Sequence, residues 1–89
     1  SALRILCLQE DIADHMVAMI KGAMDELRVD NPMELTTDVG PVIDAEAQGN
    51  LLAHIEKMKT AAKSYHQIKL PENADKATFV APCCLNWTI

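Results

Sequence analysis

Residues 3–9 are apolar at almost every position, and the segments that follow change to other spacings of apolar and polar side chains. Only Arg4 interrupts this first run before Gln9. A strand that is covered on both faces in a parallel sheet is apolar at successive positions, so the run predicts a buried strand from Leu3 to Gln9. It is also shorter than a typical helix, whose mean length is about 11 residues.

The next segment has the three- and four-residue spacing of an amphipathic helix, which we expect from Glu10 to Val29. Acidic residues at its start suit the helix dipole, and Asn31-Pro32 stops it. Its apolar stripe consists of Ile12, Met16, Met19, Ile20, Ala23, Met24 and Leu27. Such a stripe is typical of core packing, and a face that binds a partner stays open as the alternative.

The second half of the chain predicts one more helix and two short strands. A loop that contains two prolines, two threonines and one glycine covers residues 31–43, and Asp44 is the expected N-cap of a helix from Ala45 to Lys63. Loosely alternating runs predict strands at Tyr65–Leu70 and Ala77–Ala81, with a polar turn between them. The predicted fold class is therefore α/β, with two amphipathic helices and about three short strands.

Composition and charge exclude several classes of function. The chain has 89 residues, one small domain, and a formal net charge of −5. This charge argues against binding to nucleic acid or to an anionic membrane surface, since both need lysine and arginine. We expect no membrane span and no signal peptide, because no apolar run is long enough. With few aromatic residues, the core should be aliphatic and rich in methionine.

The spacing of the cysteines and histidines along the chain matches no known metal-binding, redox or disulfide pattern. Cys83 and Cys84 are adjacent and lack the Cys-x-x-Cys spacing, and the odd number of cysteines argues against a disulfide framework. Free thiols favour a reducing cytoplasm, with Cys7 buried as a small hydrophobe in the first strand. No two histidines lie close enough for a helical metal pair. The three are His15, His54 and His66.

Several segments, in their order and spacing, resemble one enzyme family. Residues 1–4 (Ser-Ala-Leu-Arg), an apolar run, and residues 9–11 (Gln-Glu-Asp) before a helix form the first part of the pattern. Residues 27–32, then 37–43 (Thr-Asp-Val-Gly-Pro-Val-Ile), then 79–82 (Phe-Val-Ala-Pro) continue it. This succession is similar to the stretch that follows the catalytic cysteine in aldehyde dehydrogenases.

Within that family the resemblance points to the glutamate-semialdehyde (1-pyrroline-5-carboxylate) dehydrogenase domain of bifunctional proline utilization A proteins. It covers about residues 1–82, and the tail 83–89 departs from the family pattern. Asp30 also departs, since relatives usually carry glycine there. The resemblance implies part of an NAD-dependent enzyme of proline catabolism, in which a cysteine thiolate attacks the aldehyde and hydride passes to the nicotinamide. Bifunctional relatives also carry FAD in a proline dehydrogenase domain.

The resemblance further implies where the functional residues lie. The nucleophilic cysteine would precede Ser1, so this stretch would hold no catalytic, cofactor-binding or metal-binding residue and would bind no cofactor by itself. Ser1 would line the aldehyde pocket and donate its hydroxyl to the substrate carboxylate. Alone, the chain is expected to be inactive. Its implied partner is the rest of the parent enzyme.

Two consequences follow for the chain on its own. A buried strand that lacks its neighbours exposes apolar faces and unpaired edges, which predicts homo-oligomers. The alternative function is a small, independent protein-interaction module that binds a partner through the methionine-rich first helix. The residues that would carry it are Ile12, Met16, Met19 and Met24.

Overall fold

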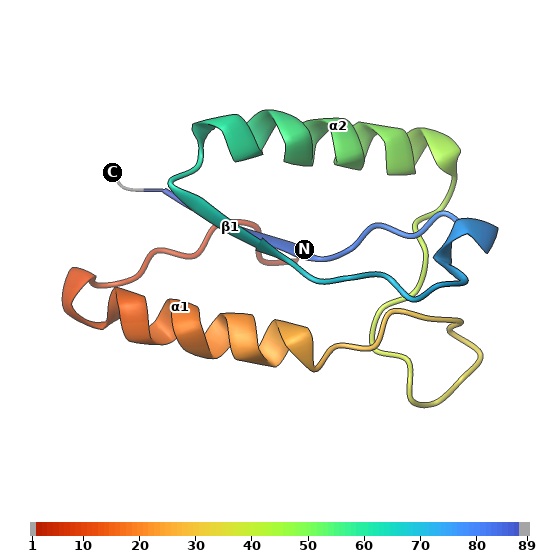
Figure 1. The fold of residues 1–89 in the computed structure, drawn as a ribbon, viewed down its shortest axis with the longest axis horizontal. Helices are drawn as coiled ribbons and strands as arrows, with labels where there is room; N and C mark the ends of the chain where they lie inside the picture. The colour runs from red at the N-terminus through yellow and green to blue at the C-terminus, as the bar shows by residue number, and fades with distance from the viewer. Residues whose placement is uncertain (1, 88–89) are drawn as a thin grey trace.

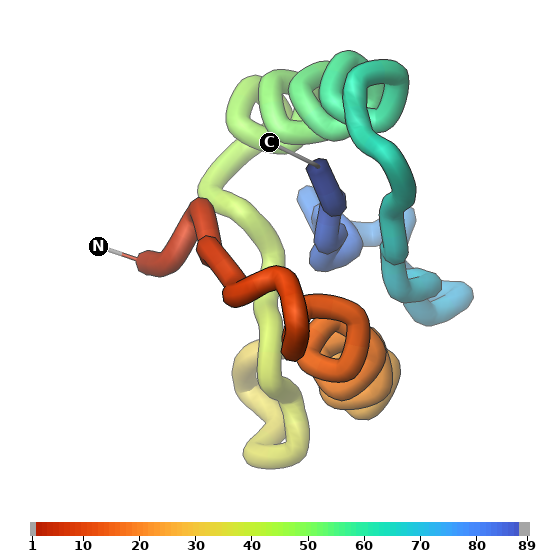
Figure 2. Tube along the Cα trace, turned by 90° about the vertical axis from the view of Figure 1, so that its left-hand side faces the viewer, coloured from red at the N-terminus to blue at the C-terminus, as the bar shows by residue number. Residues whose placement is uncertain are grey.

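The structure is a computed structural model that describes residues 2–87, and it has two helices on opposite sides of a small sheet. Figures 1 and 2 show the sheet as the middle layer, with one helix above it and the other below. This arrangement confirms the α/β prediction. In chain order the elements are α1 (Glu10–Asp25), α2 (Ala45–Ala61), β1 (Ser64–Gln67), the short 3₁₀ helix η1 (Ala74–Lys76) and β2 (Cys83–Asn86).

The sheet is one antiparallel pair, in which Ser64 of β1 lies opposite Asn86 of β2. Strand β1 lies close to where the sequence predicts it, but the strand predicted at Ala77–Ala81 is wrong, because the pairing segment comes after Pro82. Proline has no N–H to donate to a ladder, yet the Pro82 carbonyl accepts a hydrogen bond from the Ile68 N–H at 3.3 Å. The pairing therefore starts at this carbonyl and continues into the tail.

The predicted strand from Leu3 to Gln9 is also wrong, since these residues have no regular secondary structure. Ile5 is 81% exposed and Cys7 is exposed, so the expectation of a buried Cys7 is wrong as well. A strand needs a neighbouring strand to satisfy its backbone N–H and C=O groups. Among the described residues no strand lies beside this segment, and its apolar side chains stay on the surface.

Helix α1 starts at the predicted residue but ends at Asp25, before the predicted Val29. The chain leaves the helix because the backbone N–H of Arg28 binds the carboxylate of Asp38 at 2.9 Å instead of a helical carbonyl. Val29 then forms a parallel bridge with Val39. The residues after α1 thus run as an extended segment into the middle of the molecule.

Helix α2 begins as the sequence predicts. The Asp44 carboxylate accepts a hydrogen bond from the Ala47 N–H at 2.8 Å, which confirms Asp44 as the N-cap. The helix ends at Ala61 rather than at Lys63, because the Lys63 N–H binds the Asn86 carbonyl at 2.8 Å. Strand β2 therefore sets where the helix stops.

The buried core is small. It lies where the segment after α1, the segment after β1 and the residues from η1 to the start of β2 meet. Its members are Val29, Ile68, Ala74, Phe79 and Ala81, with Met24 and Val39 packed against it. The core is aliphatic with one aromatic ring, but the predicted abundance of methionine is wrong, since Met24 touches it only at the edge. Neither helix of residues 2–87 is long and apolar enough to cross a membrane.

Candidate functional site

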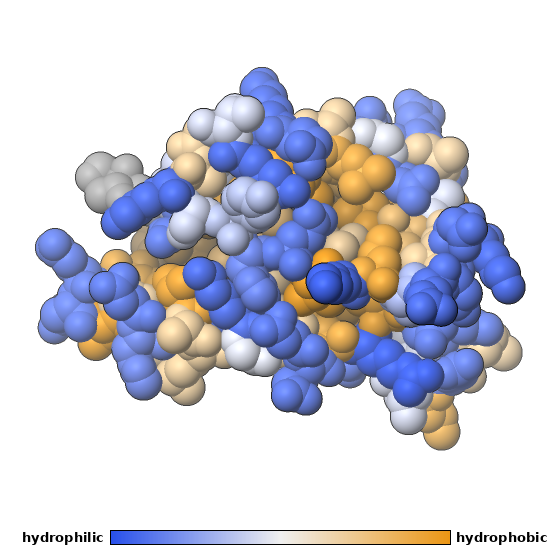
Figure 3. All heavy atoms as spheres, in the orientation of Figure 1, coloured by the Kyte–Doolittle hydropathy of each residue, from blue (hydrophilic) through white to orange (hydrophobic). Residues whose placement is uncertain are grey.

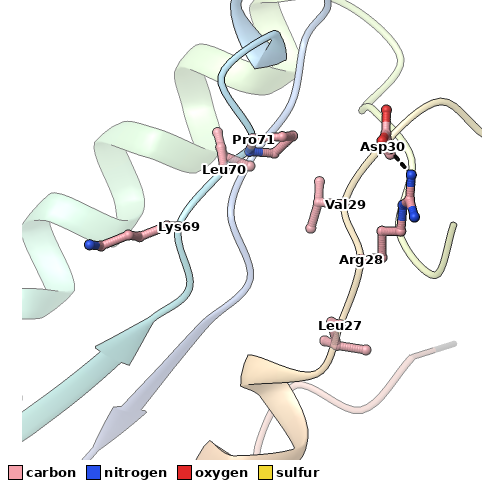
Figure 4. Close-up of a pocket in the computed structure, with 7 residues that line it drawn as sticks. All are labelled: Leu27, Arg28, Val29, Asp30, Lys69, Leu70 and Pro71. Carbon is pink, nitrogen blue, oxygen red and sulfur yellow. Dashed lines mark hydrogen bonds and ion pairs between the residues drawn. The ribbon is translucent and has the colours of Figure 1, made fainter.

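The structure shows an open hollow of about 350 Å³ between the segment after α1 and the segment after β1 (Figure 4). It is lined by Leu27, Arg28, Val29, Asp30, Lys69, Leu70 and Pro71. Val29 is among the most buried residues of the chain, whereas the charged side chains lie at the rim. The hollow is open to solvent and combines an apolar side chain at its base with a polar edge.

The two positively charged side chains at this rim, Arg28 and Lys69, differ in how free they are to bind an anion. The Arg28 guanidinium is already paired with Asp30 at 3.4 Å and with Glu34 at 3.2 Å. Lys69, on the opposite side, has its ammonium directed away from the arginine (Figure 4). A guanidinium held by two carboxylates has little charge left for an anion, so Arg28 orders the turn rather than recruits a ligand.

The resemblance predicts glycine at the position of Asp30, and the backbone here has no need of it. No non-glycine residue among residues 2–87 has a positive φ, so Asp30 needs none of the conformational freedom of glycine. Its carboxylate accepts a hydrogen bond from the Asn31 N–H at 2.8 Å and pairs with Arg28. Asp30 thus adds contacts to the turn without backbone strain.

The structure brings one histidine into a polar contact that spacing in the sequence could not reveal. His66 Nε2 lies 2.7 Å from Asp25 Oδ1, across 41 residues of sequence. His15 and His54 are exposed on the two helices. Among residues 2–87 no three histidine, cysteine, aspartate or glutamate side chains gather in a way that could hold a metal ion.

The adjacent cysteines point to opposite faces of the sheet, as neighbours in a strand do. Burial raises the pKa of the Cys83 thiol, Lys59 opposes the rise, and the neighbouring Cys84 and Glu56 add to it. Lys59 also lies 4.6 Å from the centre of the Tyr65 ring. A raised pKa keeps the Cys83 thiol protonated, which is the opposite of what a nucleophilic cysteine needs.

Ser1, the one residue that the resemblance assigns to the substrate pocket, lies outside the described residues. The sequence did not single out the hollow in Figure 4, because its two walls come from segments about 40 residues apart along the chain. The residues that line it do, however, include Leu27, Arg28 and Val29, which carry part of the resemblance to the family.

Comparison with known proteins identifies the class. The sequence profile of the aldehyde dehydrogenase family matches residues 1–88. The chain belongs to the aldehyde dehydrogenase family, and it is similar to one segment of proline utilization A enzymes. It is 50% identical over 88 residues to the bifunctional protein PutA of Klebsiella aerogenes, and equally to that of Escherichia coli strain K12. Each alignment covers 92% of this chain and 7% of the relative.

Solved structures give the same result for the fold. A crystal structure of a mutant of Bradyrhizobium japonicum proline utilization A superposes with a TM-score of 0.84 at 48% identity, over 93% of this chain and 8% of that one. A structure of proline utilization A with proline bound in remote sites has the same score and identity. The chain therefore has the arrangement that the matching stretch adopts inside these enzymes, and it spans a small part of their length.

Proposed function

We propose that the chain is part of the catalytic domain of an NAD-dependent L-glutamate-γ-semialdehyde dehydrogenase of proline catabolism. The main support is the 50% identity to bifunctional PutA proteins over 92% of the chain. In this proposal NAD is the hydride acceptor of the parent enzyme, and FAD serves its proline dehydrogenase domain. Residues 1–82 belong to the aldehyde dehydrogenase domain, and residues 83–89 are the tail that departs from the family pattern.

The 89 residues by themselves contribute structure rather than chemistry in this proposal. The hollow in Figure 4 offers a paired arginine and a lysine at its rim, and the Cys83 thiol is biased toward its protonated form. Ser1 is the one residue proposed to touch substrate, through a hydroxyl hydrogen bond to the carboxylate of the semialdehyde. The nucleophile and the cofactor site are supplied by the rest of the enzyme.

The exposed apolar surface supports the proposal that this chain is a structural part of a larger enzyme. Figure 3 shows apolar atoms gathered in the middle of one face of the molecule. The large apolar side chains with at least 70% exposure are Leu3, Ile5, Met33, Leu35 and Ile43. Scattered exposed apolar residues are normal, but this many, beside only five buried residues among residues 2–87, indicate missing partners. We propose that the rest of the parent enzyme covers them, and that the isolated chain forms homo-oligomers in its place.

The location of the parent enzyme is part of the same proposal. Cys7, Cys83 and Cys84 are all free thiols, and such thiols are stable in a reducing cytoplasm. We therefore place the enzyme there. Oxidation of the thiols without loss of folding would remove this support.

A chimera tests the proposed function directly. The matching segment of the Escherichia coli relative is replaced by residues 1–82 of this chain, and NADH formation from glutamate semialdehyde is followed by absorbance. We expect the chimera to keep aldehyde oxidation within about tenfold of the unaltered enzyme, which is a change of about 1.4 kcal/mol in the barrier. The isolated 89-residue chain, assayed in parallel, should form no NADH.

Proline oxidation and aldehyde oxidation by the chimera together distinguish a wrong proposal from a chimera that does not fold. Proline oxidation by the other domain of the chimera shows whether the protein as a whole is intact. A chimera that oxidises proline normally but has lost the aldehyde activity would contradict the proposal, and so would turnover by the isolated chain.

A binding module built on α1 is the second candidate, favoured by the exposure of Met19 (57%) and Ile12 (45%) on that helix. Light scattering of the isolated chain distinguishes the two. Self-association that weakens when Ile5 is replaced by serine supports the enzyme segment. A stable monomer at high concentration, with binding lost in Met19→Ser, would favour the module.

A further inference from the structure

The loop between α1 and α2 projects from the body of the molecule and exposes two large apolar side chains. Figures 1 and 2 show its middle part, in yellow, on the side of the sheet away from α2. Met33 is 86% exposed and Leu35 is fully exposed, and only one residue separates them. A single exposed apolar residue is normal on a protein surface, whereas two in one projecting loop form a local apolar projection. We call Met33 and Leu35 the apolar knob.

Hydrogen bonds within the loop hold the backbone on either side of the knob. The Asn31 side chain accepts a hydrogen bond from the Met33 N–H at 3.0 Å. The Asn31 carbonyl accepts two more, from the Glu34 N–H at 3.1 Å and from the Thr37 hydroxyl at 2.7 Å. The Thr37 N–H also donates to the Glu34 carbonyl at 3.2 Å. The turns are therefore closed before any partner binds, and a surface that is ordered in advance loses less entropy on docking.

The charged groups of the same loop are engaged with one another. The Arg28 guanidinium pairs with Asp30 at 3.4 Å and with Glu34 at 3.2 Å. The Arg28 backbone N–H binds the Asp38 carboxylate at 2.9 Å. Because the acidic residues of segment 28–38 all have a partner within it, the surface that meets the knob does not have to supply a positive charge. An apolar pocket with a polar edge beside the half-exposed Glu34 side chain matches the loop.

Most of the parent enzyme lies outside this chain, and it is the surface available to cover the knob. The alignments with the PutA proteins of Klebsiella aerogenes and Escherichia coli cover 7% of each relative, so more than nine-tenths of those enzymes lies beyond the match. Among residues 2–87, no element covers Met33 or Leu35. We propose that the knob docks into an apolar pocket on another part of the same parent polypeptide and so fixes this segment within the enzyme. This inference rests on the proposed function, because it requires a parent enzyme.

Oxidation of Met33 by dilute hydrogen peroxide tests the docking with the knob unaltered. Peroxide converts an accessible methionine to its sulfoxide, and peptide mass spectrometry measures the product at each methionine. The chimera that carries residues 1–82 of this chain in the Escherichia coli relative is compared with the isolated chain at low micromolar concentration. We expect Met33 to be oxidised about tenfold more slowly in the chimera, because docking encloses its sulfur. In urea, where both proteins are unfolded, the two rates should be equal.

Two substitutions in the chimera show whether the knob itself is responsible for the protection. Leu35→Ser removes most of the apolar surface that docking buries, so Met33 should be oxidised within about twofold of its rate in the isolated chain. Thr36→Ser, at the neighbouring exposed position, should leave Met33 protected. Proline oxidation by each chimera shows that the protein is folded. Aldehyde oxidation plays no part in this readout, so the docking and the enzymatic proposal fail separately.

Three results would overturn the docking proposal. The first is an equal rate of Met33 oxidation in the folded chimera and in the isolated chain. The second is protection that survives Leu35→Ser, since another contact would then cover Met33. The third is protection that disappears when the chimera is diluted, because a second copy of the enzyme would then be the surface that covers the knob.

Discussion

Removing the N-cap of α2 tests whether a local side-chain contact stabilises the whole chain. In Asp44→Ala the Ala47 N–H loses its 2.8 Å acceptor, and the first turn of the helix loses a negative charge. An N-cap contributes about 0.5–2 kcal/mol, and because Asp44 is exposed, water replaces part of the lost bond. We therefore expect a loss of about 1 kcal/mol, which lowers the Tm of a chain this size by about 4–8 °C.

The assay is urea unfolding followed by far-ultraviolet circular dichroism, with two controls. Asp44→Asn keeps the acceptor but not the charge, so it should cost no more than about 0.5 kcal/mol. Glu72→Ala removes one exposed carboxylate elsewhere and should change stability by less than about 0.5 kcal/mol. If Asp44→Ala is as stable as Glu72→Ala, the capping argument is refuted. A loss equally large in Asp44→Asn would show that charge, not the hydrogen bond, is responsible.

Three further predictions concern packing and reactivity. Gly49→Ala should stabilise the chain by about 0.4–1 kcal/mol in urea unfolding, because no atom lies within 4 Å of the added Cβ; a loss of stability would contradict this. Phe79→Ala should cost about 3–5 kcal/mol and unfold the small core, whereas Phe79→Leu should retain a cooperative transition; equal effects would argue against ring packing. Iodoacetamide should label the exposed Cys7 faster than Cys83 near pH 8, because burial raises the Cys83 pKa, and Lys59→Gln should slow Cys83 further. Equal labelling rates, measured by peptide mass spectrometry, would refute that order.

The parts of the structure that follow from neighbouring residues were accessible from the sequence. The start of α1 at Glu10 and the cap of α2 at Asp44 depend on contacts within three or four residues. The family pattern was equally readable, because it consists of short segments in a fixed order, and the match of the family profile to residues 1–88 confirms it. Helix ends were less accurate, since tertiary hydrogen bonds to Asp38 and Asn86 stop the two helices early.

The remaining features were decided by the tertiary structure, because they depend on what lies beside a segment. The apolar run at 3–9 has the composition of a strand, but without a neighbouring strand it has no partner for its backbone groups and stays exposed. The last strand forms after Pro82, where a carbonyl meets the Ile68 N–H, rather than in the more strand-like segment before it. The hollow in Figure 4 and the contact between His66 and Asp25 each join segments about 40 residues apart, and no local pattern records such a distance. The sequence by itself thus determined the family, the helix starts and the α/β class, whereas strand position, burial and the pairing of charges required the folded chain, since each is a relation between distant residues.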